Sequence, residues 1–368
     1  MARTRWIVPQ RILMGKPIFY HCISRVVDRR LAFERDEKER FRMFMRMYEN
    51  FTGCRVVSYC LMSNHFHLLL EVPPPPVDGF TDEELLERLR AIYSELQVAE
   101  VAKELALARQ TVAEGLGQEA ALVTPIHARY TRRMHDLSRF MEGLLQRFTL
   151  WFNRTHSRSG NLWEDAFKSV IVEDGIAART ISAYIDLNPV RAGIVTDPAN
   201  YRWSGYGEAI GGGARGNGKK ARAGLVRALM AHKGYEADAR HWDSKVAKDY
   251  QILLLEGGKE ILKVAANAAG GSEMRVVRKG IKKALVKAEL EQIERSGNLA
   301  LGKILHCRIR YFTDGAVIGS RIFVDEAFAN ARERFGLKRK TGARKMKGNG
   351  AAASNELWSL RDLKQRIS

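Results

Sequence analysis

The sequence of 368 residues has little cysteine, little proline and no long apolar run. Its cysteines form no Cys-x-x-Cys pair, which argues against a disulfide framework and against a zinc knuckle. They are Cys22, Cys54, Cys60 and Cys307. The apolar runs fall short of the ~20 residues that a membrane-spanning helix needs, and the N-terminus lacks the apolar core of a signal peptide. These absences predict a globular protein of a reducing cytoplasm, with no membrane partner.

Acidic residues are scarce relative to basic ones, and the formal net charge is +19. Residues 1–210 carry 28 Lys and Arg against 26 Asp and Glu, a net charge of +2. Residues 211–368 carry 33 against 16, a net charge of +17. A region this basic attracts polyanions, and nucleic acid is the default partner. The alternative is a basic surface that serves only solubility.

The hydrophobic pattern predicts strands and helices in alternation along the N-terminal part. Strands are expected at residues 17–27, 55–61, 65–72 and 162–172, and helices at 35–51, 131–154 and 177–187. Residues 81–121 are rich in Glu, Ala and Leu and contain no proline, so they are expected to form a helical hairpin or arm. This arm is interpreted as an insertion at about 77–130.

A glycine-rich stretch at residues 211–220 is the predicted linker between two domains, 1–210 and 221–368. Beyond the linker the pattern predicts a mainly helical domain. Its helices are expected at residues 222–233, 242–256, 274–296, 300–312 and 322–334. From its charge, this second domain is interpreted as a DNA-binding domain.

The motif His65-Phe66-His67 lies in an apolar stretch that ends at four consecutive prolines, residues 73–76. The stretch reads as a buried strand, and residues two apart on a strand point to the same face. His65 and His67 therefore direct both imidazoles to one place, and two converging imidazoles make half of a divalent-metal site. The alternative is two unrelated strand histidines.

A second signal lies on the helix expected at 177–187, where Tyr184 and Asn188 are four residues apart and share one face. Asn188 offers an oxygen ligand to a hard cation, and Tyr184 offers a phenol nucleophile. The two histidines and Asn188 would hold Mg²⁺ or Mn²⁺, and a metal so placed suits phosphoryl transfer. The alternatives are a tyrosine packed on the sheet and an asparagine that caps the helix before Pro189.

These two motifs carry a resemblance to a known family. The segment Met62-Ser63-Asn64-His65-Phe66-His67-Leu68-Leu69-Leu70 resembles the HUH motif of the IS200-like, single-tyrosine transposases. The segment Tyr184-Ile185-Asp186-Leu187-Asn188-Pro189-Val190-Arg191-Ala192-Gly193 resembles their tyrosine helix. More narrowly, the chain resembles the REP-associated tyrosine transposases. The motifs stand in the order of that family, and the resemblance covers roughly residues 10–207.

The resemblance implies an α+β fold, namely a ferredoxin-like αβ sandwich with a central antiparallel sheet. It implies an enzyme that cleaves and rejoins single-stranded DNA at hairpin-forming repeats through a 5′-phosphotyrosine. His65 and His67 then correspond to metal ligands, Asn188 to a third ligand and Tyr184 to the nucleophile. The expected partners are single-stranded or hairpin DNA and a second copy of the chain in a homodimer, without a small-molecule cofactor. The expected location is the cytoplasm, at a bacterial nucleoid.

Several basic residues are candidates for contacts with DNA phosphates. They are Arg25, Lys168, Arg191, Lys338, Arg339 and Lys340. Ordinary surface charges, or a helix cap in the case of Arg191, are the alternative interpretation. His21 lies on the first expected strand, and we interpret it as a core residue or a DNA contact rather than as a further metal ligand.

Two other functions fit parts of the pattern. A domesticated transposase could bind DNA as a regulator without cutting it, but the intact His65, His67 and Tyr184 argue against this reading. A nickase of the replication-initiator type would share the metal and tyrosine site. However, relaxases usually place the tyrosine before the histidines, and the sequence has no GxxxxGK[ST] helicase signature.

Overall fold

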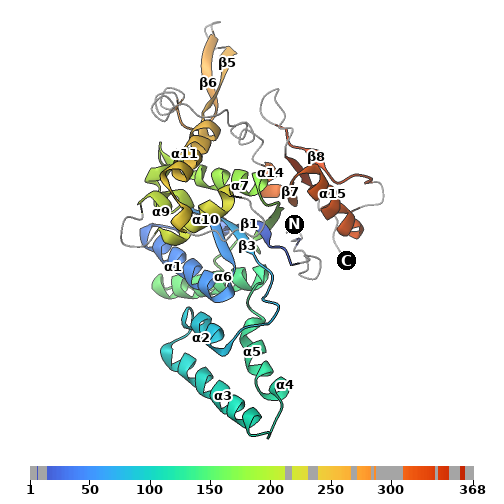
Figure 1. The fold of residues 1–368 in the computed structure, drawn as a ribbon. Helices are drawn as coiled ribbons and strands as arrows, with labels where there is room; N and C mark the ends of the chain where they lie inside the picture. Colours follow the sequence, from blue (N-terminus) through green and yellow to red (C-terminus); the bar gives the residue numbers. More distant parts are fainter. Residues whose placement is uncertain are drawn as a thin grey trace.

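The computed structural model describes residues 6, 15–211, 218–230, 239–266, 272–282, 286, 310–335, 339–347 and 357–360. A seven-stranded sheet lies at its centre, with helices on both faces (Figure 1). Within the described residues, no helix is both long and apolar enough to cross a membrane. The sheet and its covering helices make the fold α+β, as the sequence predicts.

Four N-terminal strands form an antiparallel half of the sheet. They are β1 (Ile18–Arg25), β2 (Arg55–Leu61), β3 (His65–Val72) and β4 (Lys168–Val172). Strand β1 pairs with both β3 and β4, and β2 pairs with β3, so the order is β4-β1-β3-β2. Helices lie between β1 and β2 and between β3 and β4, which gives the β-α-β-β-α-β path of a ferredoxin-like sandwich. The predicted fold class is confirmed.

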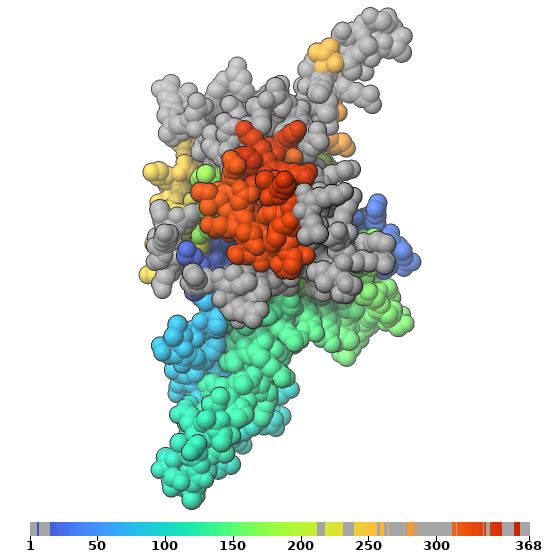
Figure 2. All heavy atoms as spheres, turned by 90° about the vertical axis from the view of Figure 1, so that its right-hand side faces the viewer, coloured from blue at the N-terminus to red at the C-terminus, as the bar shows by residue number. Residues whose placement is uncertain are grey.

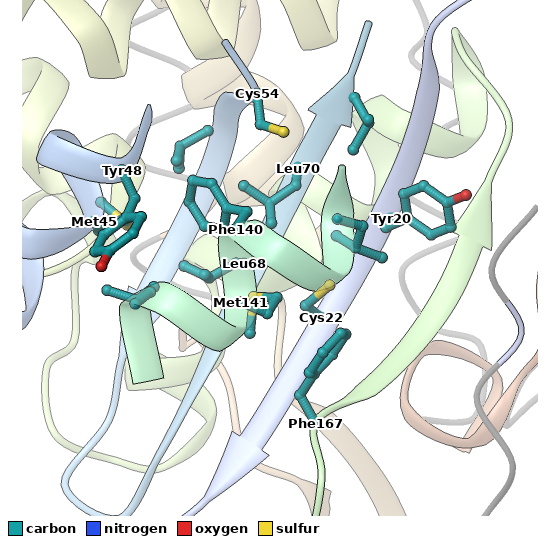
Figure 3. Packing of buried hydrophobic residues seen from close by; sticks show 14 of the residues in the cluster. Tyr20, Cys22, Met45, Tyr48, Cys54, Leu68, Leu70, Phe140, Met141 and Phe167 are labelled. Atoms are coloured by element: carbon teal, nitrogen blue, oxygen red, sulfur yellow. The ribbon is translucent and has the colours of Figure 1, made fainter. Parts of the chain in front are cut away.

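Two long helices, α1 (Arg35–Thr52) and α6 (Leu137–Thr155), cover one face of this sheet. Figure 3 shows Phe140 and Met141 of α6 packed over Leu68 and Leu70 of β3. The even-numbered residues of β1 and β3 supply this core, because side chains alternate along a strand. The expected helix 131–154 begins later, since the Asp136 side chain caps it by accepting a hydrogen bond from the backbone N–H of Arg139.

The opposite face is covered by helices from both sides of the glycine-rich stretch. They are α7 (Ile176–Asp186), α8 (Asn188–Arg191), α9 (Gly205–Gly211), α10 (Lys219–Leu229) and α11 (Ser244–Gly258). Odd-numbered residues of β1 and β3, such as Phe19 and Leu69, point into this second core, as does Val170 of β4. Single 3-10 turns occupy Val27–Arg29, Pro198–Asn200, Ala239–His241 and Arg332–Arg334.

A helical arm extends from the body between β3 and α6 (Figures 1 and 2), and the interpretation of residues 77–130 as an insertion remains a prediction. Side-chain oxygens of Thr81 and Ser94 cap its first two helices. Buried leucines of the arm, including Leu85, Leu89 and Leu105, belong to the same apolar cluster as the α1–α6 core. Its helices are α2 (Asp82–Arg90), α3 (Glu95–Ala113), α4 (Glu119–Leu122) and α5 (Thr124–Thr131).

The C-terminal part joins the same sheet. Strand β7 (Val317–Gly319) pairs in parallel with β4, and β9 (Trp358–Leu360) and β8 (Arg344–Lys345) continue the sheet beyond it. Helices α14 (Arg310–Asp314) and α15 (Arg321–Asn330) accompany these strands. The division into domains at 211–220 remains a prediction. The described residues on its far side nevertheless share the sheet and the core of the N-terminal part.

Two expected elements differ from the structure. The helix predicted at 274–296 is wrong where it is described, because Ser272–Arg278 forms β6 and pairs with β5 (Ile261–Ala266) in a hairpin that projects from the body (Figure 1). The strand predicted at 162–172 begins only at Lys168. Before it, Trp163 makes a single bridge to Val26 and buries its ring in the α1–α6 core.

Candidate active site

The alternation of β3 places His65 and His67 on the face that α7 covers. Their neighbours Phe66 and Leu68 point to the opposite face, into the α1–α6 core. The ring centroids of His65 and His67 lie 5.1 Å apart, and that of His67 lies 5.9 Å from that of Tyr184. The structure therefore brings the two histidines and the tyrosine together, although they come from elements that are distant in sequence.

Tyr184 lies in an enclosed position on α7, with 2% of its surface exposed. The ring of Phe312 from α14 stacks on the ring of Tyr184, with their centroids 4.6 Å apart. The guanidinium carbon of Arg191 lies 4.9 Å from the centroid of the tyrosine ring, and the ring of His21 lies 6.0 Å from it. Phe312, which lies 128 residues after Tyr184 in the sequence, thus covers the tyrosine.

Each histidine of the motif has a hydrogen-bond partner at its Nδ1 atom. For His65 the partner is the side-chain oxygen Oδ1 of Asn64, at 2.7 Å. For His67 the partner is Nε2 of His21, at 3.0 Å, and Nδ1 of His21 in turn lies 2.9 Å from the backbone oxygen of Phe312. The partners at Nδ1 leave the Nε2 atoms of both motif histidines as the positions at which a metal could bind.

The environment favours neutral imidazoles. Burial, together with the positive charge of Arg25, lowers the pKa of His65 to about 4. Burial also holds the pKa of His67 well below its usual value, with further lowering by His21, His65 and two arginines. A neutral imidazole is the form that binds a metal, so both side chains are prepared for that role at neutral pH.

The residues at this place fit a divalent cation if the third protein ligand is an amide oxygen. Among the described residues, no three His, Cys, Asp or Glu side chains form a metal cluster. The Asn188 amide nitrogen donates to the carbonyls of Tyr184 and Ile185, at 3.1 and 3.2 Å, and so caps the helix. This arrangement leaves the amide oxygen for a cation, and the role of Asn188 as a ligand remains a prediction.

Three of the expected DNA contacts lie around the histidines. Arg25 is the Cα partner of His65 between β1 and β3, so their side chains share a face. Lys168 begins β4, is exposed and pairs with Ile23. Arg191 donates to the carbonyl of Tyr184 at 3.2 Å. The contacts of these three residues with DNA remain predictions. Their positions near the histidines are compatible with binding to a phosphate.

The other three expected DNA contacts belong to the C-terminal extension of the sheet. Lys338 lies outside the described residues. The guanidinium of Arg339 packs on the rings of Phe328 and Phe335 and donates to the carbonyl of Thr341, while Lys340 is exposed. These residues precede β8 and do not lie on the strands that carry the histidines.

Two residues of the site carry roles that the sequence did not predict. His21 was expected to be a core or DNA-contacting histidine, and the structure shows it fully buried and bonded to His67. Its position as the fourth residue of the first strand, on the same face as the motif, was the available signal. Nothing in the sequence pointed to Phe312, because 291 residues separate it from His21.

Comparisons with known proteins support the resemblance in part of the chain. Residues 16–77, which contain β1 to β3 and the histidine motif, match the family model described as "Transposase IS200 like". A solved structure of a REP-associated tyrosine transposase bound to a REP hairpin is 12% identical, with a TM-score of 0.33; the match covers 65% of this chain and 97% of that one. No curated protein matches the chain. The resemblance to IS200-like transposases is confirmed for residues 16–77.

Proposed function

We propose that this protein is a metal-dependent tyrosine transposase that cleaves and rejoins single-stranded DNA through a 5′-phosphotyrosine intermediate. One observation carries the proposal: Tyr184 lies beside His67, with ring centroids 5.9 Å apart, against the strands that match the IS200-like family. Neutral histidines that face a tyrosine across a sheet and a helix are suited to phosphoryl transfer by a tyrosine nucleophile.

In this proposal the Nε2 atoms of His65 and His67 and the amide oxygen of Asn188 hold Mg²⁺ or Mn²⁺. When bound, the cation polarises a phosphoryl oxygen and orients the scissile bond. The chain needs no small-molecule cofactor for this reaction. Arg25 and Arg191 add positive charge beside the histidines, where the charges of a phosphodiester would develop.

The reaction of Tyr184 is an in-line displacement at phosphorus. The phenol oxygen gives up its proton and forms a bond with phosphorus, the bond from phosphorus to the 3′ oxygen breaks, and that oxygen takes up a proton. The 5′ end of the DNA is then linked to the tyrosine, and the energy of the phosphodiester is retained. Attack by a second 3′-hydroxyl reverses the exchange and joins the strands.

Access to the tyrosine requires a movement in the C-terminal part. Tyr184 is 2% exposed, and Phe312 stacks on its ring. A DNA strand therefore reaches the tyrosine only after residues that enclose it, Phe312 among them, have moved. We propose hairpin-forming repeats as the substrate, because the resemblance implies them, with Lys168, Lys338, Arg339 and Lys340 as phosphate contacts.

The experiment that tests the proposal is a covalent-adduct assay with labelled single-stranded hairpin oligonucleotides and Mn²⁺ or Mg²⁺. The wild type should give a shifted band on a denaturing protein gel, and Tyr184→Phe should give none while it still binds the DNA. Tyr206→Phe is the control, since Tyr206 is buried in the same apolar cluster. An adduct that survives in Tyr184→Phe would refute the role of this tyrosine.

A separate variant tests the metal site of the proposal. His65→Ala should abolish adduct formation and weaken binding of Mn²⁺, because one of two imidazole ligands is lost. His127→Ala is the control, since His127 lies on the arm and pairs with Asp82. Full activity of the wild type in EDTA would contradict the metal site.

A non-catalytic DNA-binding regulator is the second candidate function. The observation that favours it is the enclosure of Tyr184 under Phe312, which fits a protein that never exposes this residue. Specific DNA binding without an adduct, with both metals and with several hairpins, would favour the regulator.

A further inference from the structure

A chain of two hydrogen bonds links the C-terminal part of the protein to the histidine motif. The backbone oxygen of Phe312 lies 2.9 Å from Nδ1 of His21, and Nε2 of His21 lies 3.0 Å from Nδ1 of His67. All of these atoms are buried, because His21 is 0% exposed and His67 is 3% exposed. Neither the role of His21 in this chain nor that of the Phe312 carbonyl is part of the function proposed above.

The chemistry of these atoms fixes where the protons lie. A carbonyl oxygen only accepts hydrogen bonds, so Nδ1 of His21 must carry a proton and donate it to Phe312. A charged imidazolium at this fully buried position would need a carboxylate partner, and none of the described carboxylates is bonded to His21. His21 is therefore neutral, and its Nε2 atom carries a lone pair.

The second bond follows from the first. Since Nε2 of His21 can only accept, Nδ1 of His67 must donate to it, at 3.0 Å. A neutral His67 with its proton on Nδ1 carries its lone pair on Nε2. If the protons were placed the other way, the lone pair of His21 Nδ1 would face the lone pairs of the Phe312 oxygen at 2.9 Å, which is repulsive.

We infer that His21 is a positioning residue that, together with the backbone carbonyl of Phe312, holds His67 in the tautomer that presents Nε2 to a metal ion. The inference rests on the proposed function only for the metal, since the tautomer follows from the hydrogen bonds alone. Partners at the far nitrogen of a ligating histidine fix its tautomer and ring orientation, and their loss typically costs about 10–100-fold in metal affinity.

Phe312 also connects this chain of hydrogen bonds to Tyr184. The carbonyl of Phe312 fixes His21, while its ring stacks on Tyr184 with centroids 4.6 Å apart. One C-terminal residue therefore contacts the nucleophile directly and the histidine pair through His21. A change of the Phe312 side chain removes the ring contact and keeps the carbonyl, so the two roles are separable by mutation.

The tautomer is measured by ¹⁵N NMR of the histidine side chains in the metal-free protein. We expect the His67 signals, assigned by their loss in His67→Gln, to show a proton on Nδ1 and none on Nε2. In His21→Leu, which removes the acceptor, we expect this preference to be lost. His21→Gln retains a side-chain oxygen that can accept from His67, so it should preserve the tautomer. A wild-type His67 with its proton on Nε2 would overturn the inference, whether or not His21→Leu folds.

The metal affinity gives the second reading, measured with Mn²⁺ by electron paramagnetic resonance. We expect His21→Leu to bind Mn²⁺ about 10–100-fold more weakly and His21→Gln to stay within about threefold of the wild type. His135→Leu is the matched control, because His135 is also buried and its Nδ1 bonds a backbone oxygen, that of Pro73, at 3.1 Å. An equal loss in all three variants would reduce His21 to a structural residue.

These readings separate the two proposals. If the wild type binds no Mn²⁺ and its His67 carries the proton on Nδ1, the metal-dependent function fails and the positioning role of His21 stands. If His21→Leu binds Mn²⁺ as tightly as the wild type does, the positioning role of His21 fails and the metal site stands.

Discussion

At the scale of single residues, Gly224 shows how closely the C-terminal part approaches the sheet. It lies on α10, buried against strand β2, and an added Cβ would lie 2.6 Å from the backbone oxygens of both Val56 and Val57. These are backbone atoms of a paired strand, which cannot swing aside as a side chain does. The absence of a side chain at Gly224 is therefore a packing requirement.

We expect Gly224→Ala to lower the free energy of unfolding by about 2 kcal/mol, because the helix must move away from β2. Urea denaturation measures this change. Gly211→Ala is the control, since a Cβ there meets no atom within 4 Å, and it should stay within about 0.5 kcal/mol of the wild type. Equal stability of the two variants would contradict the close packing of α10 on β2.

The sequence predicts part of the candidate site at this scale. The period of two along a strand is enough to place His65 and His67 on one face, and the structure agrees. It could not predict that His21 would bond His67 rather than remain a core histidine. That choice depends on the carbonyl of Phe312, which lies in a part of the chain that sequence patterns do not relate to β1.

At the scale of elements, a partly buried ion network connects α10 to β3 and to the turn before α7. Arg227 on α10 donates to Glu71 of β3 at 2.9 Å and to Asp174 at 2.8 Å. Both Arg227 and Glu71 are buried. Removal of one partner from such a network leaves a charge without compensation in the interior.

We expect Arg227→Met to lower the free energy of unfolding by about 3 kcal/mol, chiefly because Glu71 would keep only the longer contact to Arg55, at 3.6 Å. Thermal or urea unfolding provides the measurement. Arg202→Met is the control, because Arg202 is exposed and its pair with Glu39 is expected to contribute little. If both variants unfold alike, α10 is not held by this network.

Helix α14 covers the tyrosine, and this contact is testable by chemical modification. Nitration of Tyr184 by tetranitromethane, followed by mass spectrometry, should be slow in the wild type because its ring is 2% exposed. In Phe312→Ala the stacked ring is removed, so we expect nitration several-fold faster. Half-buried Tyr130 on α5 of the arm serves as the internal reference, since its environment is unchanged. The same rate at Tyr184 in both proteins would mean that Phe312 is not the cover.

The elements with a clear hydrophobic period were predicted from the sequence. The elements that depend on pairing with other strands were not. Residues 55–61 and 65–72 form the strands expected of them. The helix expected at 274–296 failed because its basic, apolar pattern suits a strand as well, and pairing with β5 decides between them. In the sequence, the Gly270-Gly271 pair favours a hairpin over a helix.

At the scale of the whole molecule, the C-terminal part completes the core of the N-terminal part. Residues such as Leu225, Tyr250, Phe312 and Ile318 share one buried cluster with Tyr184. Their removal would expose the apolar face of α7 and of the sheet to water. The sequence suggested two separate domains, because the charge and the glycine content change at 211, but neither property reports on packing.

We therefore expect a fragment of residues 1–210 to lose cooperative unfolding and near-ultraviolet circular dichroism, because it lacks α10, α11 and α14, which complete the core on one face of its sheet. The full-length protein under the same conditions is the control. A fragment that unfolds cooperatively would instead support the two domains predicted from the sequence.

The distribution of charge along the sequence also separates the arm from the proposed DNA-binding region. Residues 82–131 carry 5 Lys and Arg against 9 Asp and Glu, a net charge of −4, whereas residues 211–368 carry +17. Phosphates are repelled by the first region and attracted by the second. This contrast favours a protein contact, such as a homodimer, over a DNA contact for the arm.

The central claim is that Tyr184 becomes linked to the 5′ end of cleaved DNA, and peptide mass spectrometry tests it most directly. After reaction with a single-stranded hairpin and Mn²⁺, the protein is digested with nuclease and trypsin. Tyr184 is the one tyrosine in the tryptic peptide of residues 180–191. We predict that this peptide carries a 5′-linked nucleotide on Tyr184. An unmodified peptide beside a nucleotide on another residue would contradict the account.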